Sequence, residues 1–136
     1  RAINVRSGSD VCLIGAGTLL PTVMAAADLL QARGISARVE SFHTIKPLDE
    51  ASLEQAFAGY AVVGVVEEHS RIGGLGGAIA EWLARQEPMK GRLLGFGVDD
   101  SFMHEIGSQE YARAKYGLTA DNIAAKVEAA FRKTAG

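Results

Sequence analysis

The sequence has little cysteine, no surplus of basic residues and no long hydrophobic run, and each deficit excludes a class of protein. The single cysteine, Cys12, excludes a disulfide framework, and its apolar neighbours predict a buried thiol in a reducing compartment, expected to be the cytoplasm. The 14 basic and 16 acidic residues give a net charge of −2, so we expect no nucleic-acid partner. No apolar run is long enough to span a bilayer, so we expect no membrane partner.

The common signatures of catalysis and cofactor binding are also missing. The sequence contains no P-loop, no G-x-S-x-G elbow, no H-x-x-x-H and no cysteine pair with metal-ligand spacing. Gly15-Ala16-Gly17 begins a dinucleotide fingerprint, but Leu20 stands where a third glycine or alanine is needed. The glycines at 74 and 76 fail in the same way at Ile79. Spacing alone therefore assigns no catalytic residue, no cofactor-binding residue and no metal ligand.

The sequence does contain apolar runs that alternate with amphipathic segments. At 136 residues and 48% hydrophobic composition, without a linker or internal repeat, it predicts one domain over residues 1–136. The alternation is typical of an α/β fold, in which helices cover both faces of a largely parallel sheet. We expect strands at 2–6, 11–14, 35–39, 61–66 and 93–98, and four helices capped or begun near 18, 49, 75 and 119.

Local patterns add detail to this fold. Thr18, Asp49 and Thr119 have the capping chemistry of helix starts. The strand at 2–6 lies so close in sequence to the next that the two are either antiparallel neighbours or lie apart, because a parallel crossover needs a dozen residues. The strand at 35–39 alternates apolar and polar residues, which predicts a half-exposed strand near an edge.

The stretch 61–83 carries the candidate functional residues. A buried strand runs into a polar turn and then a helix, and sites in α/β sheets collect at such turns. The turn comprises Glu67, Glu68, His69, Gly73, Gly74, Gly76 and Gly77. Glu67, Glu68 and His69 could form an acid–base set or ligate a metal, and His43 and His104 add two more imidazoles, but no spacing matches a metal site. No second catalytic group can be placed beside Glu67, which favours a structural or interdomain role in which Glu67 binds backbone N–H groups. The glycines fit either turn geometry and close packing or an anion-facing site.

Two motifs together resemble a known family. Thr44-Ile45-Lys46-Pro47-Leu48-Asp49, and Val65-Val66-Glu67-Glu68-His69 with Gly73-Gly74-Leu75-Gly76, resemble the C-terminal domain of transketolase-like thiamine diphosphate enzymes. The resemblance extends over nearly the whole chain and is strongest to transketolases encoded as two polypeptides. It implies a three-layer α/β/α sandwich whose mixed five-stranded sheet is mostly parallel, with the first strand antiparallel.

The resemblance also implies a function for a longer protein. An intact transketolase of pentose phosphate metabolism would transfer a two-carbon ketol unit between sugar phosphates, using thiamine diphosphate and Mg²⁺ bound by upstream pyrimidine- and diphosphate-binding domains of a homodimer. This chain, which begins at Arg1, would be its non-catalytic C-terminal structural and dimer-contact fragment, with no cofactor bound to it. The alternatives are the same domain of deoxyxylulose-phosphate synthase or of a 2-oxo acid dehydrogenase beta subunit, or a stand-alone docking or anion-binding module.

Overall fold

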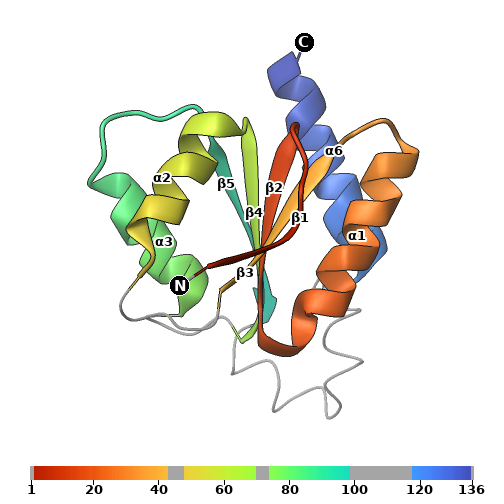
Figure 1. Ribbon diagram of the computed structural model, residues 1–136, viewed down its shortest axis with the longest axis horizontal. Coiled ribbons are helices and arrows are strands. Elements are labelled where there is room, and N and C mark those ends of the chain that lie inside the picture. Colours follow the sequence, from red (N-terminus) through yellow and green to blue (C-terminus); the bar gives the residue numbers. More distant parts are fainter. Residues whose placement is uncertain (1, 43–47, 70–73, 99–117, 136) are drawn as a thin grey trace.

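The computed structural model describes residues 2–42, 48–69, 74–98 and 118–135. In this part of the chain, a five-stranded sheet is covered by helices on both faces, which confirms the α/β/α sandwich predicted from the sequence (Figure 1). The strands are β1 (Ile3–Arg6), β2 (Val11–Ala16), β3 (Ala37–Phe42), β4 (Val62–His69) and β5 (Arg92–Val98). The helices are α1 (Leu20–Ala32), α2 (Glu50–Gly59), α3 (Leu75–Ala84) and α6 (Ala120–Ala135), with a 3-10 turn η1 (Gly17–Leu19) before α1.

The strand order is β1-β3-β2-β4-β5, and β1 alone runs antiparallel to its neighbour. The prediction that the first strand is antiparallel is therefore confirmed. Its partner is β3 and not β2, so β1 and β2 lie apart in the sheet, which is one of the two arrangements that the sequence left open. The chain after β1 is held at the start of β3, where the Ser36 N–H donates to Asp10 Oδ2 at 2.7 Å. At this outer edge, the side chains of Ile3 and Val5 are 51% and 39% exposed.

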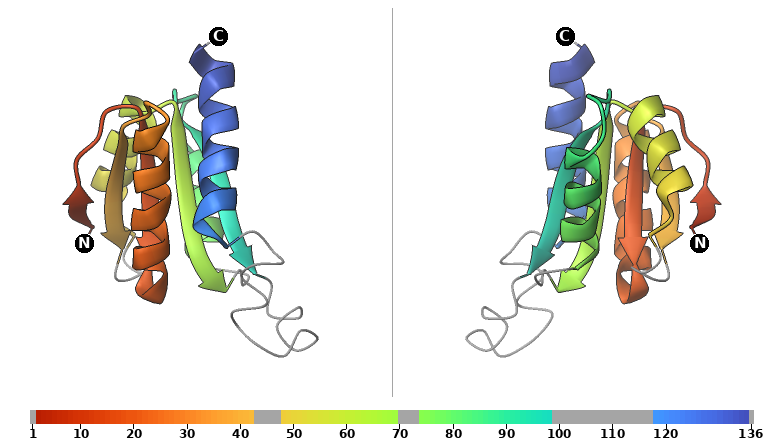
Figure 2. Two further views of the ribbon diagram at one scale, coloured as in Figure 1. Left: turned by 90° about the vertical axis from the view of Figure 1, so that its right-hand side faces the viewer. Right: turned by 90° about the vertical axis from the view of Figure 1, so that its left-hand side faces the viewer.

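The core consists of two layers separated by the sheet. Figure 2 shows the helices that cover the two faces. On one face α1 and α6 bury their apolar stripes, and the four residues of α1 predicted to face inward are all buried: Val23, Ala26, Ala27 and Leu30. On the other face α2 and α3 meet at Phe57 and Trp82, whose ring centroids lie 6.0 Å apart. Burying both faces of the central strands explains why they read as unbroken apolar runs in the sequence.

Two of the three predicted helix caps are confirmed. Asp49 Oδ1 accepts a hydrogen bond from the Ser52 N–H at 3.1 Å, and Thr119 Oγ1 accepts one from the Asn122 N–H at 3.2 Å. The prediction for Thr18 is wrong, because η1 intervenes and places Leu19 at the N-cap of α1 without a side-chain cap. A tight turn continuing a strand directly into a helix removes the extended residue that a capping threonine requires.

The half-exposed third strand is a second correction. In β3, Glu40 and Ser41 are only 4% and 8% exposed. The reason is that β1 folds back along β3 and places Asn4 opposite Glu40, so β3 lies near the edge, as predicted, but is covered rather than half exposed.

The carboxyl end of β4 positions the candidate site. This strand continues to His69, so Glu67, Glu68 and His69 belong to the strand and not, as predicted, to the turn after it. The pairing with β5 shifts register between Val66 and His69 and resumes at His69, which stands opposite Val98. In the described ranges, no helix combines the length and apolar character needed to cross a membrane.

Candidate functional site

The predicted glycine turn lies where β4 passes into α3. Gly74 is the N-cap residue of α3, with an extended backbone at φ −69° and ψ 179°, and Gly76 and Gly77 lie in the first turn of the helix. Gly73 lies outside the described residues. Most of the glycine cluster is therefore the start of a helix, and it sits at the edge of the sheet where the parallel strands end.

Glu67 links the end of β4 to the start of α3. Its Oε1 accepts a hydrogen bond from the Leu75 N–H at 3.0 Å, and its Oε2 accepts one from the Gly76 N–H at 2.6 Å. The carboxylate thus binds two of the N–H groups that a helix N-terminus leaves without partners. This arrangement confirms that Glu67 holds the turn closed through backbone N–H groups.

The identity of residue 76 follows from this contact. A Cβ atom built on Gly76 would lie 2.6 Å from Glu67 Oε2, which is closer than such atoms approach in proteins. A Cβ on Gly77 would meet nothing within 4 Å. The two neighbouring glycines therefore differ in the space around them: a side chain at residue 76 would meet Glu67, whereas one at residue 77 would meet open space. The sequence alone could not show this difference, because both glycines belong to one cluster.

The electrostatics of α3 favour this carboxylate. The first turn of the helix contains no acidic residue, and its N-cap glycine has no side chain to accept a hydrogen bond. Glu67 supplies from the neighbouring strand the negative charge that a helix N-terminus attracts. An external anion at these two N–H groups would have to displace Glu67.

The other titratable groups of the predicted site are placed only in part. His69 is the last residue of β4 and stands opposite Val98 of β5. His43 and His104 lie outside the described residues, as does the long segment at 99–117. Within the described ranges, no group of three or more His, Cys, Asp or Glu residues could hold a metal ion.

The first glycine turn has a packing role. Gly15 lies in β2, where an added Cβ would approach Val23 Cγ2 of α1 to 3.0 Å. The absence of a side chain at residue 15 lets α1 pack closely against the sheet. Close packing therefore accounts for Gly15 without a bound dinucleotide.

The geometry defines a class: an α/β/α domain whose strand-end turn is closed by its own carboxylate. Residues 1–123 match the family described as "Transketolase, C-terminal domain". The chain therefore belongs to the transketolase C-terminal domain family, and the family predicted from the two motifs is confirmed.

Relatives of known sequence include both transketolase sections and a synthase. The chain is 36% identical over 126 residues to a putative transketolase C-terminal section of Methanocaldococcus jannaschii, covering 93% of this chain and 38% of the relative. It is 37% identical over 123 residues to a 6-deoxy-6-sulfo-D-fructose transketolase subunit of Clostridium sp. (strain MSTE9), covering 90% and 37%. It is 36% identical over 135 residues to the 1-deoxy-D-xylulose-5-phosphate synthase of Desulforudis audaxviator, covering 99% and 21%.

Solved structures give the same fold. A split-gene transketolase described as an inactive beta4 tetramer superposes with a TM-score of 0.84 at 35% identity, covering 97% of this chain and 42% of that one. A Pichia stipitis transketolase has the same fold at 17% identity, with a TM-score of 0.65 and coverage of 96% and 18%. The chain thus spans between about a fifth and two fifths of the proteins that it matches.

Proposed function

We propose that this chain is the C-terminal section of a thiamine diphosphate-dependent transketolase that transfers a two-carbon ketol unit between sugar phosphates. The observation that carries the proposal is the similarity, over almost the whole chain, to a putative transketolase C-terminal section and to a split-gene transketolase. Both relatives are short enough that this chain spans about two fifths of their length. The intact enzyme would be a homodimer acting in pentose phosphate metabolism in the cytoplasm, a location that the buried thiol of Cys12 favours.

In this proposal the chemistry belongs to upstream domains or to a partner subunit. Thiamine diphosphate, held with Mg²⁺ in pyrimidine- and diphosphate-binding domains, would supply the carbanion chemistry. The residues of this chain do not fit that group well, because Glu67 already occupies the two N–H groups at the start of α3 where a phosphate would bind. We expect calorimetry to detect no binding of thiamine diphosphate to the 136-residue chain. Binding with micromolar affinity would contradict this division of labour.

The strand-end turn is the proposed docking surface for an upstream domain or subunit. It comprises Glu67, His69, Gly73, Gly74, Gly76 and Gly77. Glu67 would act by fixing the start of α3, and His69, at the end of β4, would lie beside the partner. We expect His69→Ala to weaken assembly of the complete enzyme and to leave the melting temperature of this chain nearly unchanged. The control is Lys90→Ala, because Lys90 is exposed and lies beyond α3.

The outcome separates docking from a purely structural role. If His69→Ala lowers the melting temperature strongly and assembly persists, measured by analytical ultracentrifugation of the complete enzyme, the turn serves the fold alone. If Lys90→Ala weakens assembly as much as His69→Ala, the effect is not specific to the turn.

The second candidate is the C-terminal domain of a 1-deoxy-D-xylulose-5-phosphate synthase. It is favoured by relatives of that name that are 36–40% identical to this chain. A mass-spectrometric assay of the complete protein distinguishes the two. Exchange of two-carbon units between sugar phosphates supports the transketolase, and formation of 1-deoxy-D-xylulose 5-phosphate supports the synthase.

A further inference from the structure

A groove with basic walls lies between α6 and β5. It encloses about 220 Å³ and is lined by three cationic and three apolar residues: Arg92, Lys126, Lys133, Leu94, Ala129 and Ala130. We call it the basic groove. No acidic residue lines it in the described part of the chain, although acidic residues outnumber basic ones in the full sequence. The charge of the groove is therefore opposite to that of the protein.

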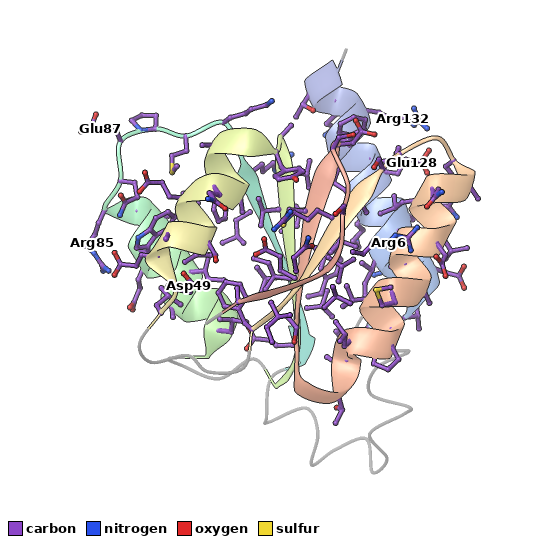
Figure 3. All side chains as sticks on the ribbon, in the orientation of Figure 1. Arg6, Asp49, Arg85, Glu87, Glu128 and Arg132 are labelled. Carbon is purple, nitrogen blue, oxygen red and sulfur yellow. The ribbon has the colours of Figure 1, made fainter. Side chains whose placement is uncertain are left out.

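The three cations of the basic groove are available to a ligand. Arg92, Lys126 and Lys133 are exposed, and none of their side chains makes an ion pair or a hydrogen bond with another described residue. Arg132, next in sequence to Lys133, behaves differently: it turns toward α1 and binds Glu128 at 2.8 Å (Figure 3). The cations of α6 therefore lie on two faces. Arg132 forms an ion pair within the protein, whereas Lys126 and Lys133 face the groove and form none with a described residue.

The helix dipole and the protection of a strand edge explain only two of the three cations in the basic groove. Lys133 lies in the last turn of α6, where the helix dipole favours a cation, and Arg92 begins an edge strand, where charge opposes aggregation. Lys126 lies in the middle of the helix, where neither reason applies. The helical residues of the groove follow the spacing 126, 129, 130 and 133, which places two lysines on one stripe with small residues between them.

Among the described residues, no strand pairs with the outer edge of β5. β5 ends the sheet, and β4 is its one neighbour among the described strands. Arg92 and Leu94 alternate on β5 and both line the groove, so they face α6. A strand added beside β5 would bond to its backbone and place every second side chain against the basic groove. From this combination we propose that the basic groove and the edge of β5 dock an extended acidic segment of a partner polypeptide.

The spacing of the cations favours an elongated partner over a compact anion. The backbone positions of Lys126 and Lys133 are seven residues apart on a helix, which corresponds to about 10 Å. Alternate residues of a strand lie roughly 7 Å apart, so two carboxylates on one face of a strand match the two lysines within the reach of their side chains. The small residues Ala129 and Ala130 keep the floor of the groove between the lysines low, which leaves space for side chains of the added strand.

The test uses the 136-residue chain and a blocked octapeptide with glutamate at every second position and valine or threonine between. We expect amide chemical shifts to change in β5 and along residues 126–133, and amide exchange in β5 to slow. The double substitution Lys126→Gln and Lys133→Gln should weaken binding about tenfold, as expected for the loss of two exposed ion pairs. The matched control is the double substitution Arg85→Gln and Lys90→Gln, which removes the same charge. Both residues are exposed and lie outside the groove. Figure 3 shows Arg85 on the opposite side of the sheet from α6.

Three outcomes would overturn the proposal. A control variant that weakens binding as much as the groove variant would show attraction by net charge alone. A peptide of the same composition with contiguous glutamates that binds equally well would exclude strand addition. Inorganic phosphate that produces the same shifts in β5 and α6, with the same affinity as the peptide, would define a small-anion site instead.

Discussion

Glu67 and Gly76 are complementary in shape and charge. The Gly76 N–H donates to Glu67 Oε2 at 2.6 Å, and a Cβ atom on residue 76 would lie 2.6 Å from that same oxygen. A side chain at residue 76 would therefore force the carboxylate out of its present position at the start of α3. This relationship couples the end of β4 to the orientation of α3.

The first prediction compares the two adjacent glycines. Alanine in a helix is about 1 kcal/mol more favourable than glycine, so Gly77→Ala, with open space at its Cβ, should stabilise the chain by about 0.5–1 kcal/mol. Gly76→Ala should destabilise it by about 1 kcal/mol, because displacing Glu67 forfeits hydrogen bonds to a charged group worth about 1.5–3 kcal/mol. Urea denaturation monitored by circular dichroism measures both free energies of unfolding.

A double-mutant cycle identifies the cause. In a Glu67→Ala background no carboxylate opposes a side chain at residue 76, so Gly76→Ala should become neutral or stabilising, as Gly77→Ala is in the parent. If Gly76→Ala costs the same free energy with and without Glu67, the cost arises from the backbone, and the proposed coupling is wrong.

The second prediction concerns Asp49, which caps α2 and also ties down β1. Its Oδ2 accepts from the Ala2 N–H at 2.8 Å and its Oδ1 from the Ser52 N–H at 3.1 Å. These hydrogen bonds, the Ala2 N–H first, lower the pKa of Asp49 below its ordinary value of 3.8. A lowered folded-state pKa adds stability above pH 3.8 that is lost as the pH falls through the folded-state pKa.

Asp49→Asn should therefore cost stability mainly at neutral pH. Asparagine still caps a helix but lacks the charge, so we expect a loss of up to about 1 kcal/mol at pH 7 that shrinks below pH 4. Thermal unfolding at several pH values measures the difference. Glu81→Gln, on the exposed face of α3, is the control and should show no comparable trend.

Periodicity and apolar runs predicted most of the fold because they report burial directly. The stripe of α1 and the buried run of β4 both lie where the sequence placed them. The errors have two physical origins. Thr18 does not cap α1 because a local 3-10 turn intervenes, and the second error arises from contact between residues distant in sequence. Glu40 was expected to be half exposed, and it is buried because β1 returns to cover β3.

The candidate site was predictable in its location but not in its details. A strand that runs into glycines indicates the turn, and the hydrogen-bonding role of Glu67 follows from an acid beside a helix start. The distinction between Gly76 and Gly77 depends on a tertiary distance. The basic groove was not predicted, because Arg92 and the lysines of α6 are 34 or more residues apart in sequence and only the sheet order brings them together.

The third prediction concerns the pair formed by Arg38 and Glu40. Arg38 Nε donates to Glu40 Oε2 at 2.6 Å, and the side chain of Glu40 is 5% exposed whereas that of Arg38 is 26% exposed. Glu40 Oε1 is buried without a hydrogen-bond partner among the described residues. Removing the arginine leaves a buried carboxylate, whereas removing the glutamate leaves a guanidinium that can reach water.

The two single substitutions should therefore differ in cost. We expect Arg38→Met to destabilise the chain by about 2–3 kcal/mol, below the upper values for fully buried pairs because Arg38 is partly exposed. Glu40→Met should cost less than about 1 kcal/mol, and the double variant should recover most of the loss. Urea denaturation of all four chains provides the cycle, and equal costs for the two single variants would show that burial of Glu40 is not the dominant effect.

The fourth prediction concerns the reactivity of Cys12. The thiol is fully buried, and burial, with a smaller contribution from the charge of Glu40, raises its pKa to about 12. Because only a thiolate reacts appreciably with iodoacetamide, the folded chain should be inert at pH 8.5 and should react only through unfolding. The alkylation rate, measured by mass spectrometry, should then rise with urea in parallel with the unfolded fraction. A second thiol introduced by Ala80→Cys on the exposed face of α3 should react at once, and equally fast reaction of Cys12 in the folded chain would mean that β2 opens locally.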